Sequence, residues 1–248
     1  MDYKIVGDVM QALRLDLRQG EEVYAEAGAM LYMSQGIDLQ AKMQGGLMKG
    51  LMRKFLAGET MFMSVFRCDS PTAHLALANP IAGKIFPIEL KGNTILAERN
   101  AYLAAVGNVD LSVAFTKRFG AGLFGGEGFI LQKISGQGLL FLHAGGNMLE
   151  FQLAPGEQLR VDTGCIVSMA DSVGYDIQFV GGFRNALFGG EGLFYATLTG
   201  PGHVVLQSLP FSRLANRIAA ATGRNKEESK GLAGLAGNVL GGIISGDD

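Results

Sequence analysis

One hexapeptide occurs twice in this chain. The sequence LFGGEG at positions 123–128 returns unchanged at positions 187–192, a displacement of 64 positions within a chain of 248 residues. An internal repeat of this kind is typical of proteins built from successive copies of one structural unit. The repeat therefore constrains the architecture, but it does not by itself indicate a reaction.

The similarity extends on both sides of the hexapeptide and reaches a third stretch of the chain. Positions 153–159 (LAPGEQL) match positions 17–23 (LRQGEEV) at a displacement of 136, and Gly92 matches Gly156 at a displacement of 64. We therefore predict three copies, at residues 1–83, 84–147 and 148–211, followed by a C-terminal segment at 212–248.

Apolar residues alternate with polar ones inside each predicted copy. Leu13, Leu15 and Leu17 enclose Arg14 and Asp16 in the first copy, and the same period of two recurs at positions 149–153. This period predicts strands with one buried face. Glycine supplies 37 of the 248 residues and favours the turns between short strands. The chain is therefore predicted to be all-β, a sandwich or barrel of short strands.

Helix is expected in only two places. A short run that begins near Ser212 is stopped by Gly223, and a charged linker and a Gly-rich apolar tail follow it. The tail is expected either to order only on contact or to dock on a neighbouring subunit or a membrane. In the first copy, an insert at 41–56 is rich in Met and Lys and has apolar residues at helical spacing.

Each predicted copy combines basic and large apolar residues beside a Gly-Glu step. We take these residues as the candidate interaction surface: Leu47, Leu51, Arg53, Lys54 and Phe55 in the first copy, Lys117, Arg118 and Phe124 in the second, and Arg184 and Phe188 in the third. Two interpretations stay open for it. The apolar groups are buried inside an oligomer, or they insert into an anionic membrane surface to which the cations are attracted.

The ionisable residues do not form a recognisable catalytic or metal-binding motif. Glu59, Glu127 and Glu191 occupy one repeat position and are expected to be structural, because copies of a repeat need not converge on one another. The three histidines lack metal-ligand spacing, and neither cysteine has an adjacent base. We therefore predict that the protein is not an enzyme and binds no metal or cofactor.

Composition restricts the cellular setting. The formal charge of -2 argues against bulk electrostatic binding of nucleic acid. The two cysteines, Cys68 and Cys165, fall at unlike positions, which favours a reducing compartment over a disulfide framework. No signal peptide or stretch of about 18 apolar residues is found. A cytoplasmic protein, peripheral to the membrane if associated with it, is expected.

Several segments together resemble a known family. They are positions 26–33 (EAGAMLYM), 123–129 (LFGGEGF), 161–165 (VDTGC) and 206–211 (LQSLPF). The chain is identified by them as similar to the mitochondrial biogenesis family named for altered inheritance of mitochondria. The resemblance implies a fold like that of the tryptophan RNA-binding attenuation protein (TRAP), a short double-stranded β-helix, here tripled in one chain. It also implies that three chains would close a ring of nine units.

Two functional hypotheses follow. The first is a non-enzymatic, ring-forming scaffold or interaction protein, a homotrimer that binds a partner or an anionic membrane surface. The alternative is a small-molecule or RNA-binding module that uses clefts between copies or subunits. No set of Lys and Arg that matches the RNA-contacting pattern of the attenuation protein repeats at equivalent positions in all three copies. RNA binding is therefore supported by the resemblance in fold alone.

Overall fold

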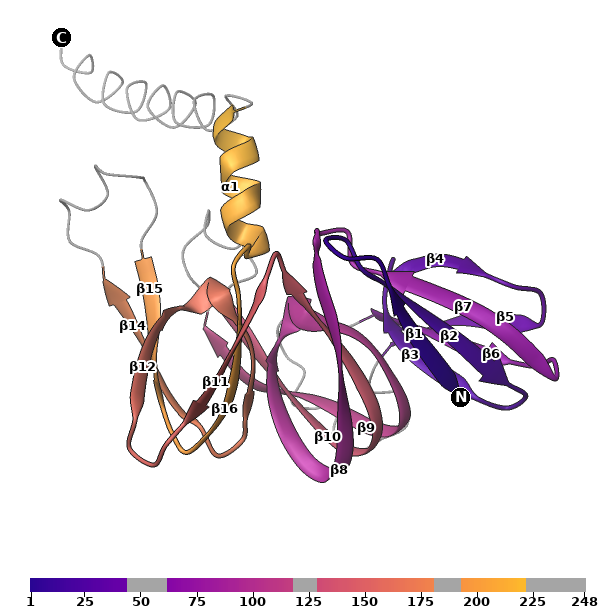
Figure 1. The fold of residues 1–248 in the computed structure, drawn as a ribbon, viewed down its shortest axis with the longest axis horizontal. Coiled ribbons are helices and arrows are strands. Elements are labelled where there is room, and N and C mark those ends of the chain that lie inside the picture. Colours follow the sequence, from indigo (N-terminus) through magenta and orange to yellow (C-terminus); the bar gives the residue numbers. More distant parts are fainter. Residues whose placement is uncertain (44–61, 118–128, 181–192, 222–248) are drawn as a thin grey trace, which may run out of the picture. The chain divides into compact units, whose positions relative to one another are not determined.

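The computed structural model describes residues 1–43, 62–117, 129–180 and 193–221, most of which lie in antiparallel β-strands (Figure 1). The first seven strands are β1 (Asp2–Val6), β2 (Ala12–Arg18), β3 (Glu22–Glu26), β4 (Met30–Met33), β5 (Ile37–Met43), β6 (Phe62–Cys68) and β7 (Thr72–Ala78). Three long strands follow: β8 (Gly83–Glu98), β9 (Tyr102–Lys117) and β10 (Phe129–Gly145). The last six are β11 (Met148–Leu153), β12 (Gln158–Asp162), β13 (Ile166–Ala170), β14 (Gly174–Val180), β15 (Leu193–Thr199) and β16 (Gly202–Gln207). The predicted all-β class is confirmed.

The strands form three sheets. A four-stranded sheet has the order β1-β2-β7-β4, and a three-stranded sheet has the order β12-β15-β14. The third sheet has nine strands in the order β5-β6-β3-β9-β10-β8-β13-β16-β11. Strands from the first, middle and last parts of the chain are thus hydrogen-bonded side by side in one sheet.

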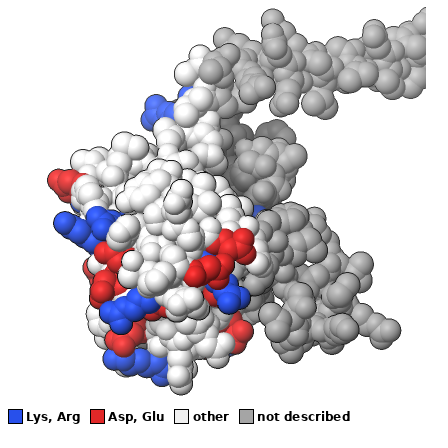
Figure 2. Space-filling model, turned by 90° about the vertical axis from the view of Figure 1, so that its right-hand side faces the viewer, with Lys and Arg blue, Asp and Glu red and all other residues white. Residues whose placement is uncertain are grey.

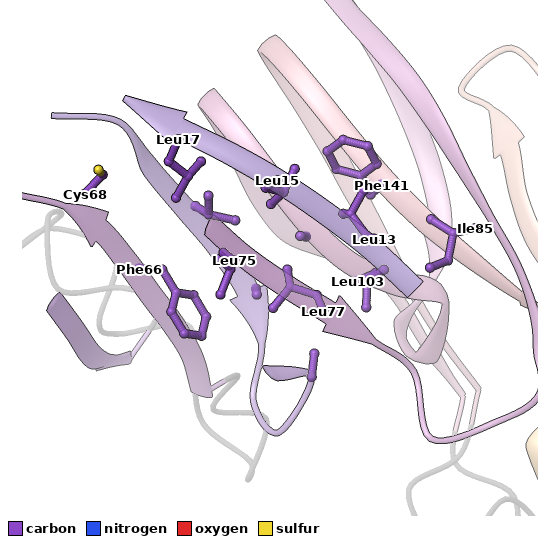
Figure 3. Close-up of a cluster of buried hydrophobic side chains, with 14 of the residues drawn as sticks. Leu13, Leu15, Leu17, Phe66, Cys68, Leu75, Leu77, Ile85, Leu103 and Phe141 are labelled. Carbon is purple, nitrogen blue, oxygen red and sulfur yellow. The ribbon is translucent and has the colours of Figure 1, made fainter. Parts of the chain in front are cut away.

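The alternating leucines of β2 face the interior, as their spacing predicts. Leu13, Leu15 and Leu17 are buried, and they pack with Leu75 and Leu77 of the paired strand β7. Figure 3 shows these side chains directed toward Phe66 of β6 on one side and toward Phe141 of β10 on the other. This core is therefore closed by residues of both the four-stranded and the nine-stranded sheet.

The middle part of the chain differs from the prediction of short strands. Strands β8, β9 and β10 contain 16, 16 and 17 residues. Glycines lie within these strands with positive φ, 88° at Gly92, 99° at Gly107 and 121° at Gly136. Glycine adopts this conformation at little cost, and it bends a strand at an irregularity without ending it. The prediction of short strands was therefore wrong here.

Two 3₁₀ turns have the same construction. One spans Arg99–Ala101 and the other Thr163–Cys165, 64 positions further on. Before each turn a carboxylate accepts a hydrogen bond from the backbone N–H two residues later, Glu98 from Asn100 and Asp162 from Gly164, both at 2.9 Å. The acidic side chain thereby satisfies an N–H group that the turn leaves without a backbone partner.

The segment after the sheets forms a separate unit, 211–248, of which the structure describes the helix α1 (Phe211–Ala221). The helix predicted to begin near Ser212 is therefore present. Among the described residues, no helix combines the length and apolar character needed to cross a bilayer. The predicted tail and positions 44–56 of the helical insert predicted at 41–56 lie outside the described residues, whereas positions 41–43 belong to strand β5.

Candidate functional site

Almost all of the candidate interaction residues lie in segments that the structure does not describe. These are Leu47, Leu51, Arg53, Lys54, Phe55, Arg118, Phe124, Arg184 and Phe188, together with Glu59, Glu127 and Glu191. Lys117 is the last residue of β9, and its side chain is not among those described. That surface therefore stays a prediction. The described residues contain a different exposed apolar surface.

Strand β4 carries four consecutive apolar side chains that are all exposed. The exposed fractions are 41% for Met30, 57% for Leu31, 50% for Tyr32 and 38% for Met33. Because successive side chains of a strand point to opposite faces, this exposure means that neither face of β4 is covered. Adjacent exposed apolar groups of this size indicate a binding surface.

Corresponding stretches of the chain are buried. Positions 102–105 at the start of β9 and 166–169 in β13 follow β4 by 72 and 136 residues. None of the eight side chains in these two stretches is more than 2% exposed. Strand β9 lies between β10 and β3, and β13 lies between β16 and β8, whereas β4 pairs only with β7 among the described strands. The missing second neighbour accounts for the exposure of β4.

A second unpaired edge belongs to β12. This strand pairs with β15 and has no other strand beside it in the described part of the chain. Its Arg160 is exposed, with the guanidinium carbon 5.8 Å from the centre of the Tyr195 ring. Tyr195 in turn donates a hydrogen bond from its hydroxyl to Oε1 of Gln178 at 2.7 Å. The ring holds the cation beside the open edge by cation–π attraction.

Two junctions inside the nine-stranded sheet show how such edges pair. In the first junction β3 meets β9 through Val23↔Val106, Tyr24↔Ala105 and Ala25↔Ala104. In the second junction β8 meets β13 through Ile95↔Ala170, Leu96↔Met169 and Ala97↔Ser168. The paired residues of β8 follow those of β3 by 72 positions, and the paired residues of β13 follow those of β9 by 64 positions. The same register is therefore built twice.

The described charged groups of the four-stranded sheet that contains β4 are of both signs. Asp16 of β2 contacts Arg14 at 3.1 Å and Nδ1 of His74 at 2.6 Å on the exposed surface of the four-stranded sheet. The hydrogen bond from His74 is the main cause that lowers the pKa of Asp16 below its ordinary value. On the face seen in Figure 2, acidic and basic side chains lie next to one another. This mixture favours a specific protein contact over attraction to a polyanion.

Burial shifts the pKa of the half-buried Glu26 and of the buried His143 in opposite directions. Burial raises the pKa of Glu26 to about 7, against the opposing effect of the Arg99 guanidinium. Burial also lowers the pKa of His143 to about 4. Among the described residues, no group of three or more His, Cys, Asp and Glu side chains could hold a metal ion. Neither Cys68 nor Cys165 forms a disulfide.

One open groove of about 610 Å³ lies where β1 meets the bends of β8, β9 and β10. It is lined by Tyr3, Pro87, Glu89, Leu90, Val106, Gly107, Gly138 and Leu139. Its charged residue Glu89 pairs with Lys91 at 2.9 Å. The binding of a small molecule in a cleft stays a prediction, because the lining does not point to a ligand class.

Sequence reasoning did not single out β4 or β12. The run MLYM at 30–33 belongs to a segment that carried the family resemblance, but four adjacent apolar residues have no period from which exposure could be judged. The available signal was the repeat itself. Strands β9 and β13 each pair with a strand of the preceding copy. Strand β4 belongs to the first copy, which has no preceding copy in the chain.

Comparison with known proteins identifies a family and related chains. The model of the family described as mitochondrial biogenesis AIM24 matches residues 3–209. An uncharacterised protein of Streptococcus pyogenes serotype M6 is 29% identical over 213 residues, which cover 83% of this chain and 84% of that protein. The crystal structure of another Streptococcus pyogenes protein has a TM-score of 0.71 at 25% identity and covers 89% of this chain and 99% of that chain. The chain belongs to the mitochondrial biogenesis AIM24 family.

Proposed function

We propose that this protein is a non-enzymatic scaffold that assembles with itself through its unpaired sheet edges. The observation that carries the proposal is the exposure of all four apolar side chains of β4, in a position whose counterparts in β9 and β13 are buried. An apolar edge strand left bare is an aggregation hazard that natural proteins normally blunt or cover. A strand from a partner would cover it.

The proposed unit of this scaffold is a TRAP-like β-sandwich that is repeated three times in the chain. Support comes from the two junctions of identical register and from the two 3₁₀ turns that lie 64 positions apart. In a chain of such units, the first and the last unit each lack the neighbour that would complete a junction, at β4 and at β12. Association of unlike edges is head-to-tail, and it closes into a ring when the rotation between chains permits. We propose a ring of three chains.

The ring would present further surfaces to a partner. In this proposal the basic and apolar residues near 47–55, with their counterparts near 117–124 and 184–188, contact a membrane protein or an anionic membrane surface. This part is supported only by the sequence, since these residues lie largely outside the described ranges. Its test is separate from that of the assembly.

Light scattering of the purified protein over a hundredfold range of concentration tests the assembly. The proposal predicts a constant mass of about three times the 26.3 kDa of one chain. A mass of one chain throughout the range would refute self-assembly. Co-sedimentation of the protein with anionic and with neutral vesicles tests the membrane contact. Binding to anionic vesicles alone supports this contact, and binding to neither kind of vesicle refutes it.

A further inference from the structure

The open edges of β4 and β12 belong to sheets that are arranged like the two sides of an internal junction. In the first junction, the strands β5-β6-β3 meet a block that begins with β9, and in the second, a block that ends with β8 meets β13-β16-β11. The three-stranded sheet β14-β15-β12 ends at β12 as the first block ends at β3. The four-stranded sheet β4-β7-β2-β1 begins at β4 as the last block begins at β13. Both halves of a third junction are therefore present in one chain, each without its complement.

The internal pairing of each half also repeats. Strand β4 pairs with β7 through Met30↔Leu77, Tyr32↔Ala76 and Met33↔Leu75, with an irregularity after the first pair. Strand β13 pairs with β16 through Ile166↔Leu206, Ser168↔Val205 and Met169↔Val204, with an irregularity at the same place. On the other side, β12 with β15 repeats the pairing of β3 with β6. Both edges are thus presented as they are in a completed junction.

We infer that β12 of one chain pairs in antiparallel register with β4 of a second copy of this chain. Positions 159–161 follow 95–97 by 64, and positions 32–34 precede 104–106 by 72. Applied to these positions, the register of the two internal junctions gives Leu159↔Ser34, Arg160↔Met33 and Val161↔Tyr32. This inference rests on the proposed self-assembly and names the strand that covers β4.

The composition of the faces agrees with this register. Tyr24 and Met63 of the first part of the chain pack on the core that contains Tyr102 and Ala105. Leu96 and Leu131 pack in the same way on the core that contains Ile166 and Met169. Arg160 and Tyr195 hold the corresponding places on β12 and β15, so in the assembly they cover Met30 and Met33 of the second copy. The stem of the arginine and the tyrosine ring supply the apolar contact there.

Cysteine cross-linking tests the register. Four single variants are made in a Cys165→Ser background: Tyr32→Cys, Ser34→Cys, Leu159→Cys and Val161→Cys. Each β4 variant is co-expressed with each β12 variant, so that a disulfide between unlike variants joins two chains. Residues directly opposite in an antiparallel pair have Cα atoms about 4.5–5.5 Å apart, within the range a disulfide spans, whereas diagonal neighbours lie about 7–8 Å apart.

The inference predicts that two of the four pairs of variants form disulfides fast and that the other two form them slowly. Under mild oxidation, Tyr32→Cys with Val161→Cys and Ser34→Cys with Leu159→Cys form a linked dimer of chains at least tenfold faster than the two diagonal mixtures. The same samples, kept reduced, are weighed by light scattering. Assemblies of wild-type mass that do not cross-link, or that cross-link equally in all four mixtures, overturn the register while self-assembly stands. If wild-type protein is a single chain, both the inference and the proposed function fail.

Discussion

Replacing Met33 with arginine should dissociate the assembly and leave the single chain folded. Met33 is already 38% exposed in the lone chain, on an edge strand with one neighbour. A charged head at this position can therefore reach water before association. In the inferred pairing, the same side chain lies directly opposite Arg160 of the next chain.

The expected cost has two parts. Full burial of a methionine side chain is worth about 1.5–3 kcal/mol, so the exposed 38% contributes about 0.5–1 kcal/mol to the interface. Two guanidinium groups about 6 Å apart repel by about 3 kcal/mol at an effective dielectric constant of about 20. Together these weaken each interface by about 3–4 kcal/mol, which is a several-hundredfold increase in the dissociation constant.

Sedimentation velocity over a range of concentrations measures this change, and circular dichroism checks the fold. Met33→Glu is the matched variant, because its carboxylate faces Arg160 with the opposite sign and should preserve the assembly. Leu39→Arg places the same charge on β5, another exposed apolar edge position outside the inferred interface, and should have no effect. Adding Arg160→Glu to Met33→Arg should restore association. The reasoning is refuted if folded Met33→Arg retains the wild-type mass at all concentrations, or if Met33→Arg and Leu39→Arg dissociate the protein equally.

Three further results are expected. The pKa of His143 falls from an ordinary value of about 6.5 to about 4 on folding. The free energy of unfolding measured in urea should therefore decrease, by at most about 3 kcal/mol, as the pH drops from about 6.5 to 4. His143→Gln should remove this decrease. The pKa of Glu26 is raised to about 7 from an ordinary value of 4.5. The contribution of Glu26 to the free energy of unfolding is therefore fullest at low pH and is lost as the pH rises from about 4.5 to 7. If the urea midpoint of Glu26→Gln falls with rising pH as much as that of the wild type, this expectation is contradicted. Gly136→Ala puts a Cβ against the Asn108 carbonyl oxygen at positive φ and should cost about 3 kcal/mol or more, whereas Gly92→Ala, with open space at its Cβ, should cost about 1–2 kcal/mol; equal shifts in melting temperature would show that the close approach is unimportant.

The sequence predicted those parts of the fold that depend on local pattern. The alternation of Leu13, Leu15 and Leu17 identified a buried strand face, and the run after Ser212 identified the helix. The hexapeptide repeat led to the 64-residue displacement that also separates the two 3₁₀ turns. Each of these features is fixed by residues close together in the sequence.

The remaining features depend on neighbours that a local pattern does not reveal. Glycine was expected mostly at turns between short strands. Gly92, Gly107 and Gly136 instead lie within long strands, because hydrogen bonding to adjacent strands continues past the bend. Apolar runs at 30–33 and 102–105 look alike in sequence, yet one is exposed and the other is buried. Their difference comes from whether a second strand lies alongside, which is a property of position in the sheet.

Amide hydrogen exchange of the wild-type protein, followed on peptides that cover β4 and β12, tests edge pairing most directly. A strand paired on one side leaves half of its amide groups open to water, whereas a strand between two neighbours has all of them protected. At concentrations where the assembly persists, edge pairing predicts that β4 and β12 exchange as slowly as β3 and residues 102–106, which are paired on both sides. Fast exchange in β4 and β12 of the assembled protein would show that these edges stay open, and would contradict edge pairing as the basis of assembly.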